Sequence, residues 1–594
     1  MIKKAFFPVL LLLLGWALFI SPTVKEVAAG VAILLFGMIM LEEGFNAFVQ
    51  GPLQKLLRRV TDKLYKSLGL GFITTAFLQS SSLISVITIS FLSAGLIELH
   101  AGIGIIFGAN LGTTATAWLV SIFGLNIKVS ALAMPMLAFG ILFVFQKTKN
   151  LKGIGYILAG LGFFFLGIHF MKQGFDVYQD SINLADYSMP GFWGLIIYTF
   201  IGIIITLILQ SSSAAMALIL TALAVGQITY NNSLALAIGA NVGTTITAIV
   251  GSLTSNVEGK RLAGAHLIFN LVTGLIALVF IGPFGQLVDF ISSSTGIAPD
   301  NYPIKLSIFH TVFNLTGVIV MVPFVNPLVK GLTKMFVEKK KVDKIEHPVY
   351  LNQSVLAYPQ TALRALLNES KRLFEKATFE IVAHGLNLHI TDIVGDEKLK
   401  NIIRKSNAEL DIDIDELYYN KVKIIYSKII KYATLAQSKF PLLPKTMETF
   451  TRIKLANRNI VETIKSIRGL RKNVNHYMLS DNKYIKKEYN EMRHKVSRVL
   501  REIHITKEQK SPELHLKRLE ALKEKANKSD VLTNGTLDKL IREQKISSVM
   551  ATSLVNDSNK VADIMKKLIE TAELLYIDSD TLISLSEQEE VAHG

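Results

Sequence analysis

The sequence contains no cysteine among its 594 residues, and it is poor in charge over its first 328 residues. Without cysteine the chain cannot form disulfides, thiolate metal sites or a cysteine nucleophile. Residues 1–328 hold 16 Lys/Arg and 11 Asp/Glu, whereas the remaining residues hold 47 and 36. This change of composition predicts a membrane domain followed by a soluble one. The net charge of +16 therefore indicates contact with membrane lipid at the cytoplasmic surface and no nucleic-acid partner.

Two further signals are missing. No small-x-small cleavage site stands between Ser21 and Glu26, after the apolar run that follows Lys3-Lys4. We therefore expect residues 1–27 to form a retained hydrophobic helix; the alternative is a signal-like peptide that is removed. The sequence also lacks metal-ligand spacing, a phosphate-cradling Gly-Lys loop and a Gly-x-Ser-x-Gly elbow, so we expect no enzyme.

The apolar part contains segments that can cross a hydrocarbon core of about 30 Å. They lie near 5–20, 28–48, 103–121, 129–146, 155–175, 234–253, 262–282 and 304–328. Two stretches, 69–97 and 193–226, are interrupted by polar residues. The distribution of basic loops places the N-terminus and the C-terminal domain in the cytoplasm. It also requires each interrupted stretch to return to its own side, as a re-entrant hairpin or, with short arms of about a dozen apolar residues, as two crossings.

One polar sequence occurs twice, as Gln79-Ser80-Ser81-Ser82 and as Gln210-Ser211-Ser212-Ser213. Each copy is followed at the same spacing by a second motif, Gly-Ala-Asn-x-Gly-Thr-Thr, at 108–114 and 239–245. Residues 71–121 and 202–252 are identical at 20 of 51 positions. The sequence is therefore duplicated. Because each unit has an odd number of crossings, we predict inverted repeats at 28–153 and 154–335, a linker at 336–350 and a soluble domain at 351–594.

The duplicated polar residues are the candidate binding site for a substrate and an ion. Serines before the apolar runs 83–97 and 214–225 are suited to cap half-helices, whose N-termini attract anions. Glutamine, threonine and carbonyl oxygens suit Na⁺. The glycines permit an unwound turn, and the asparagines are expected to tie it to the opposite hairpin. The alternative is that small and hydroxyl residues only pack helices. The candidates are Gln79, Ser80, Ser81, Ser82, Asn110, Thr113, Thr114, Gln210, Ser211, Ser212, Ser213, Asn241, Thr244 and Thr245.

Three other polar features have simpler interpretations. His266 with Asn270 and His310 with Asn314 share one spacing, and we expect each histidine to bond its neighbour or a backbone carbonyl rather than a substrate. Glu42 and Glu43 are expected at the membrane interface.

These motifs resemble those of the type II sodium–phosphate cotransporters, whose bacterial members often carry a PhoU-like cytoplasmic domain. The resemblance covers residues 28–328 strongly and 350–580 loosely. It implies an all-α, polytopic membrane protein in which the two Gln-Ser-Ser-Ser hairpins meet and bind inorganic phosphate and Na⁺, the coupling ion. It implies no organic cofactor and leaves the direction of transport open.

The last third of the chain predicts an amphipathic helical bundle, PhoU-like by resemblance, with a regulatory or partner-binding role. Its acidic cluster at 409–415 is interpreted as a solvated helix start rather than a metal site. We therefore predict a sodium-coupled phosphate symporter that works by alternating access. The alternatives are a phosphate exporter, a transporter of another oxyanion, and a membrane phosphate sensor that signals through the tail.

Overall fold

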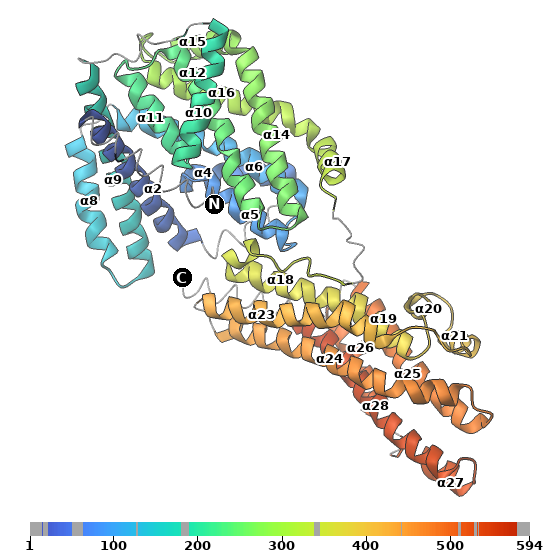
Figure 1. Cartoon of the computed structure of the whole chain (residues 1–594). Helices are drawn as coiled ribbons and strands as arrows, with labels where there is room; N and C mark the ends of the chain where they lie inside the picture. Colours follow the sequence, from blue (N-terminus) through green and yellow to red (C-terminus); the bar gives the residue numbers. More distant parts are fainter. Residues whose placement is uncertain are drawn as a thin grey trace. The chain divides into compact units, whose positions relative to one another are not determined.

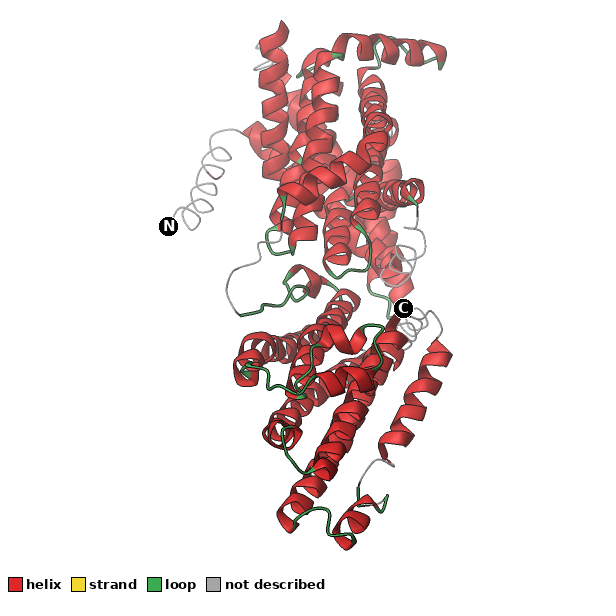
Figure 2. Cartoon of the chain, turned by 90° about the vertical axis from the view of Figure 1, so that its right-hand side faces the viewer, coloured by secondary structure: helices red, strands yellow, loops and turns green. Residues whose placement is uncertain are grey.

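The computed structural model describes residues 22–49, 63–125, 129–179, 191–337, 345–440, 444–508, 512–527, 531–532 and 534–578, with the single positions 15, 189 and 442. Every regular element within these residues is a helix, and none is a strand (Figure 2). The chain divides into two compact units at residues 338 and 339, here called the membrane unit and the soluble unit (Figure 1). The predicted N-terminal helix at 5–20 lies outside the described residues apart from Gly15.

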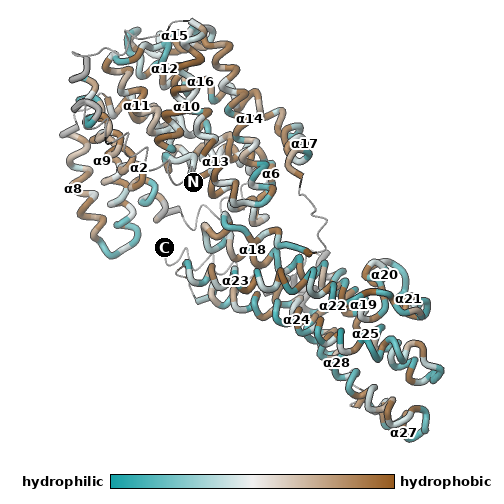
Figure 3. Tube along the Cα trace, viewed as in Figure 1, coloured by the Kyte–Doolittle hydropathy of each residue, from teal (hydrophilic) through white to brown (hydrophobic). Residues whose placement is uncertain are grey.

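Seven helical segments among the described residues are long and apolar enough to cross a membrane, which confirms a polytopic membrane protein. Their apolar side chains are visible as brown tube in Figure 3. The elements involved are α2 (Pro22–Val49), α6 (Leu99–Gly112) with α7 (Thr114–Trp118) and η1 (Leu119–Gly124), α9 (Lys149–Gln179), α10 (Gly191–Leu209), α12 (Tyr230–Gly243) with α13 (Thr245–Ser252), α14 (Val257–Val279), and α16 (Tyr302–Met321) with η3 (Val322–Phe324) and α17 (Val325–Met335).

The two interrupted stretches each form a pair of helices. The first pair is α4 (Leu64–Leu78) and α5 (Ser81–Ser93), with 15 and 13 residues. The second pair is α10 and α11 (Ser212–Ala224), with 19 and 13 residues. Helix α10 is longer than the dozen apolar residues expected for such an arm, and it is long enough to span a membrane. The shorter helices α4, α5 and α11, with α8 (Val129–Val144), complete the apolar set, and α15 (Ile281–Ser294) joins α14 to α16.

Glycines allow α2 and α9 to pack backbone against backbone. A Cβ atom added to Gly30 would lie 2.8 Å from the carbonyl oxygen of Gly167, and one on Gly37 would lie 2.7 Å from that of Gly160. Because the earlier glycine of α2 faces the later glycine of α9, the two helices run antiparallel. Such small-residue contacts are the usual way for membrane helices to approach closely.

The glycines of the second repeated motif serve the same purpose. A Cβ atom on Gly108 would lie 1.9 Å from the carbonyl oxygen of Leu68, and one on Gly239 would lie 1.9 Å from that of Thr199. Gly108 therefore lets α6 contact α4, and Gly239 lets α12 contact α10 in the same way. These two contacts fix the two polar turns against the motifs that follow them.

The soluble unit is a helical bundle with a continuous apolar core. It comprises η4 (Ser354–Ala357), α18 (Pro359–Arg372), η5 (Leu373–Thr378), α19 (Phe379–Gly385), α20 (Ile390–Val394), α21 (Leu399–Lys405), α22 (Ile414–Leu417), η6 (Tyr418–Lys423), α23 (Ile424–Lys439), α24 (Pro444–Met478), α25 (Lys483–Glu508), α26 (Pro512–Asn527), α27 (Thr536–Arg542), α28 (Ser548–Ala572) and η7 (Glu573–Asp578).

The acidic cluster of the soluble unit is a helix start. The Asp413 side chain accepts hydrogen bonds from the backbone N–H groups of Asp415, at 2.8 Å, and Glu416, at 3.1 Å. Asp415 pairs with Arg468 at 2.7 Å. No group of three or more metal-ligating side chains occurs within the described residues. The carboxylate at 413 therefore serves as a cap in this structure.

Candidate functional site

Both copies of Gln-Ser-Ser-Ser turn the chain at the glutamine. Gln79 has a φ of 54° and Gln210 a φ of 53°, which places both in the left-handed region that side chains other than glycine seldom adopt. Gln79 ends α4, and α5 begins two residues later; Gln210 stands in the same relation to α10 and α11. A residue held in this region at the centre of an apolar segment is a feature of functional sites in general.

The first serine of each copy caps the helix that follows, as predicted. Ser80 Oγ accepts a hydrogen bond of 3.2 Å from the N–H of Leu83, and Ser211 Oγ accepts one of 3.2 Å from the N–H of Ala214. The other N–H groups of a first helical turn have no partner within the helix, and they carry the positive end of its dipole. The 13-residue helices α5 and α11 therefore each present N–H donors at their starts, beside the second and third serines.

The third serine of each copy contacts a threonine of the other repeat. Ser82 Oγ lies 3.3 Å from Thr247 Oγ1. Ser213 Oγ lies 3.0 Å from Thr116 Oγ1. The offset of 131 residues that relates Ser82 to Ser213 also relates Thr116 to Thr247. The two contacts are therefore one interaction made twice, with the repeats exchanged, and they bring the two polar turns together.

The four threonines predicted in the site point back to their own helices. Their hydroxyls donate to carbonyl oxygens three or four residues earlier: Thr113 to Asn110 at 2.6 Å, Thr114 to Leu111 at 2.8 Å, Thr244 to Ala240 at 3.1 Å and Thr245 to Val242 at 2.8 Å. A hydroxyl that has donated its proton offers only lone pairs to other groups, which suits a cation rather than an anion.

The expected unwound turn in the second motif is wrong. Thr113 and Thr244 interrupt the helix assignment, but their φ values of −63° and −59° remain in the right-handed helical region. The interruption is a local tightening, in which the N–H of Thr116 donates to the carbonyl of Thr113 at 3.2 Å. The glycines did not unwind the helix because their role is to allow the contact with α4 or α10.

The asparagines bond to later helices and not to the opposite hairpin, which corrects a second expectation. The Asn241 amide donates to Asn270 Oδ1 at 3.0 Å and to Asn314 Oδ1 at 2.9 Å. Asn110 Oδ1 lies 3.4 Å from the ring Nε2 of His266. Helices α14 and α16 are thus tied to the repeated core through buried polar groups.

The His-x-x-x-Asn pairs form within their own helices. Asn270 donates to the carbonyl of His266 at 3.0 Å, and Asn314 donates to the carbonyl of His310 at 2.9 Å. The expected neighbour contact is therefore made by the histidine carbonyl and the asparagine amide. These bonds orient Asn270 and Asn314 toward Asn241.

Burial separates the two copies. Among the predicted site residues, Gln79, Ser81, Asn110, Thr113, Thr114, Ser212, Ser213, Asn241, Thr244 and Thr245 are all buried. Ser80, Ser82 and Ser211 are intermediate, and Gln210 is exposed. The Gln79 Oε1 atom accepts a hydrogen bond of 2.7 Å from Thr116, whereas the Gln210 side chain makes none within the described part of the chain.

Glu42 lies closer to the site than expected. Its carboxyl group is within hydrogen-bonding reach of the Ser80 hydroxyl, and the residue is partly buried on α2. The expectation of a purely interfacial position is therefore wrong for Glu42, while Glu43 is exposed. At the offset of 131 residues the position of Glu42 in the second repeat is occupied by Gln173.

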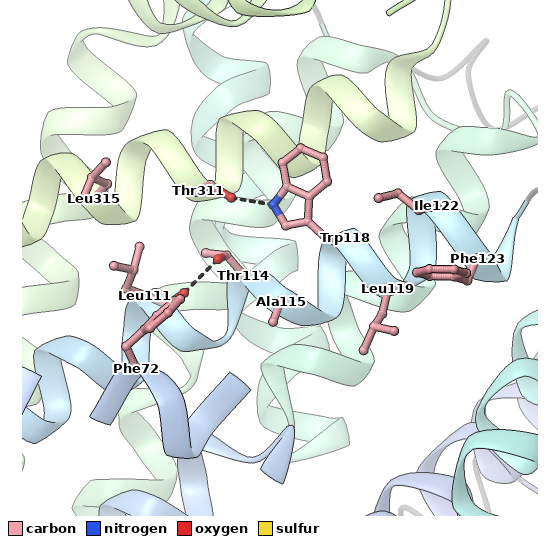
Figure 4. Close-up of a pocket in the computed structure, with 10 residues that line it drawn as sticks. All are labelled: Phe72, Leu111, Thr114, Ala115, Trp118, Leu119, Ile122, Phe123, Thr311 and Leu315. Atoms are coloured by element: carbon pink, nitrogen blue, oxygen red, sulfur yellow. Dashed lines mark hydrogen bonds between the residues drawn. The ribbon is translucent and has the colours of Figure 1, made fainter. Parts of the chain in front are cut away.

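An apolar pocket lies beside the first copy of the second motif. Figure 4 shows Thr114 turned toward the carbonyl of Leu111, and Trp118 Nε1 donating to Thr311 Oγ1 at 3.0 Å. The pocket has a volume of about 440 Å³ and is lined mainly by apolar side chains, including Phe72 and Leu315. The Trp118 bond joins α7 to α16.

Sequence reasoning missed Thr116 and Thr247, although both were identifiable. They are identical in the two repeats and lie two residues beyond the second motif. Requiring every polar identity in the aligned repeats, rather than only the clustered ones, selects them.

Interrupted helices with buried polar turns, in two copies that meet within a set of apolar helices, define a membrane transporter by architecture. Residues 33–173 and 195–293 match the family model described as Na+/Pi-cotransporter. The matched residues lie within the membrane unit and make up most of it. The membrane unit of this chain belongs to the Na⁺/Pi-cotransporter family.

Two relatives show how far the likeness extends. The protein named "Putative inorganic phosphate export protein YjbB" of Escherichia coli (strain K12) is 26% identical over 415 residues, which cover 69% of this chain and 72% of that protein. The "Uncharacterized protein YqeW" of Bacillus subtilis (strain 168) is 27% identical over 305 residues, which cover 50% of this chain and 93% of that protein. No solved structure matches the chain significantly.

Proposed function

We propose that this protein moves inorganic phosphate across a membrane together with Na⁺, by alternating access, at a site formed by both Gln-Ser-Ser-Ser turns. The observation that supports it most directly is the pair of contacts between repeats, Ser82 with Thr247 and Ser213 with Thr116. Because each contact joins the two repeats, movement of one repeat relative to the other changes both contacts together. A central site that closes from one side and opens to the other requires this property.

The chemistry of the turns suits an anion and a cation side by side. The starts of α5 and α11 supply N–H groups and serine hydroxyls for a tetrahedral oxyanion. The back-bonded threonines supply lone pairs for Na⁺. The antiparallel packing of α2 and α9, which are equivalent in the two repeats, supports an inverted arrangement. The differing exposure of Gln79 and Gln210 fits one end state of such a cycle.

Flux of radiolabelled phosphate in proteoliposomes tests the proposal. An inwardly directed Na⁺ gradient is expected to drive phosphate accumulation, and Ser82→Ala with Ser213→Ala is expected to abolish it. No Na⁺-dependent flux in either direction contradicts the proposal.

Export is the second candidate, because the Escherichia coli relative is named as an export protein. Reversing the gradients and loading phosphate inside separates the two directions. The Bacillus relative is about as long as the membrane unit alone, since 305 residues are 93% of it. Deletion of residues 345–594 is therefore expected to leave flux intact and to alter only its regulation, whereas a sensor loses its output.

A further inference from the structure

A second polar cavity lies in the membrane unit, away from the two turns. It has a volume of about 640 Å³, within the usual range for small-molecule sites. Its lining comes from the start of α10, the start of α12 and the first turn and a half of α15. Helix α12 begins at Tyr230, and Asn241 lies 11 residues further along. At 1.5 Å per residue the cavity is therefore roughly 16 Å from the central site.

The N-termini of three helices converge on this cavity. Gly191 opens α10, Tyr230 opens α12 and Ile281 opens α15, and all three residues line the cavity. These helices contain 19, 14 and 14 residues. Each N-terminus carries about half a positive charge, so their convergence favours an anion.

Two polar side chains in the lining lack partners. Asn232 is 4% exposed, and its side-chain amide makes no hydrogen bond to the residues that the structure describes. The Tyr230 hydroxyl is buried without a partner, while its ring stacks on Tyr302 with centroids 5.3 Å apart. Buried polar groups are normally satisfied, so unpaired donors in a cavity indicate a missing ligand.

One ion pair stands at the edge of the cavity. Lys305 Nζ lies 2.9 Å from Asp289 Oδ1; the Lys305 side chain is 11% exposed and that of Asp289 is 62% exposed. Asp289 lines the cavity. A carboxylate that is mostly in solvent can leave the ammonium group when a competing anion enters.

We propose that this cavity binds a phosphate-sized oxyanion through the starts of α10, α12 and α15, the Asn232 amide, the Tyr230 hydroxyl and, in exchange for Asp289, Lys305. The identity of the anion as transported phosphate rests on the proposed function; an anionic lipid headgroup offers the same phosphate chemistry. In the first case the cavity is a waiting site that collects phosphate at one end of the membrane unit.

The test measures binding of radiolabelled inorganic phosphate to the full chain in nanodiscs of zwitterionic lipid. Ser82→Ala with Ser213→Ala forms the background, so that the central site contributes nothing. One class of binding is expected to remain. Asn232→Leu or Tyr230→Phe is expected to weaken it about tenfold, since a hydrogen bond to a charged group is lost. Asp289→Asn is expected to strengthen binding, and Lys305→Met to weaken it.

Tyr302→Phe is the matched control, because it removes a hydroxyl from the stacked ring that does not line the cavity; binding is expected to be unchanged. Nanodiscs that contain phosphatidylglycerol distinguish the sources. Loss of phosphate binding there, with lipid retained by the background variant and lost in Asn232→Leu, assigns the site to a headgroup. Equal binding in both lipids assigns it to free phosphate.

The proposal is overturned if no phosphate or lipid binding remains in the background, or if Asn232→Leu and Tyr230→Phe leave it unchanged. Failure of the proposed function has another signature: the wild-type chain then shows no Na⁺-dependent flux, whatever the cavity binds.

Discussion

The chain turns at Gln79 with a φ of 54° and at Gln210 with a φ of 53°, and in each case the next serine caps the following helix at 3.2 Å. The surroundings differ. Gln79 is buried and accepts a hydrogen bond from Thr116, while Gln210 is exposed. The backbone is therefore set by the repeated sequence, and the side-chain contacts are set by how the two repeats sit against each other. The differences between the copies report on the state of the transporter.

Removing both contacts between the repeats is expected to have the largest effect. Ser82→Ala with Ser213→Ala deletes two hydroxyls that we assign to the anion, and each hydrogen bond to a charged group is worth about 1.5–3 kcal/mol. Phosphate flux in proteoliposomes is expected to fall by about 100-fold or more.

The control for this pair is Thr88→Val with Thr221→Val, in the same two helices. Both hydroxyls donate to their own helix, at 2.6 and 2.7 Å. If the control loses as much flux as the serine variant, the assignment of the serines to the site is wrong.

The glycine contacts are expected to be equally important in both repeats. Gly108→Ala and Gly239→Ala each place a Cβ atom 1.9 Å from a carbonyl oxygen, so α4 and α6, or α10 and α12, have to separate. We expect each to lower stability by about 2 kcal/mol or more, measured as thermal unfolding in detergent. Gly69→Ala, which meets nothing within 4 Å, is the control. Unequal losses at 108 and 239 contradict the equivalence of the two contacts.

The glutamines are expected to differ in accessibility. Because the chain has no cysteine, a single introduced cysteine can be labelled without background. Gln210→Cys is expected to react several-fold faster with a hydrophilic maleimide than Gln79→Cys, because residue 79 is only 8% exposed. Saturating Na⁺ and phosphate are expected to change this ratio if the repeats alternate. A ratio of one under all conditions argues against both the described state and the cycle.

The sequence predicted the helical membrane class, the two polar turns and their serine caps, because these depend on local composition and on the repeat. It did not predict the partners of Asn110 and Asn241, since they lie on helices outside the aligned segments. It also misassigned the glycines, because a helix-breaking residue and a close-contact residue have the same letter. Only the position of Leu68 and Thr199 against them distinguishes the two roles.

The smallest expected effect concerns the one carboxyl group near the turns. Glu42 is close to Ser80 in the first repeat, whereas Gln173 holds the equivalent position in the second. Glu42→Gln keeps the shape and an oxygen acceptor but removes the charge that attracts a cation. We expect the Na⁺ concentration for half-maximal flux to rise about two- to fivefold, since a partly exposed charge contributes up to about 1 kcal/mol.

The maximal rate is expected to stay near that of the wild type, because the Ser80 cap does not need the charge. Glu43→Gln, at an exposed neighbour, is the control and is expected to leave the Na⁺ dependence unchanged. If Glu42→Gln lowers the maximal rate and leaves the Na⁺ dependence alone, Glu42 orients the turn rather than attracting the ion. The difference between the repeats at this position then has a structural origin, and the cation has to be held by the uncharged oxygens that both repeats share.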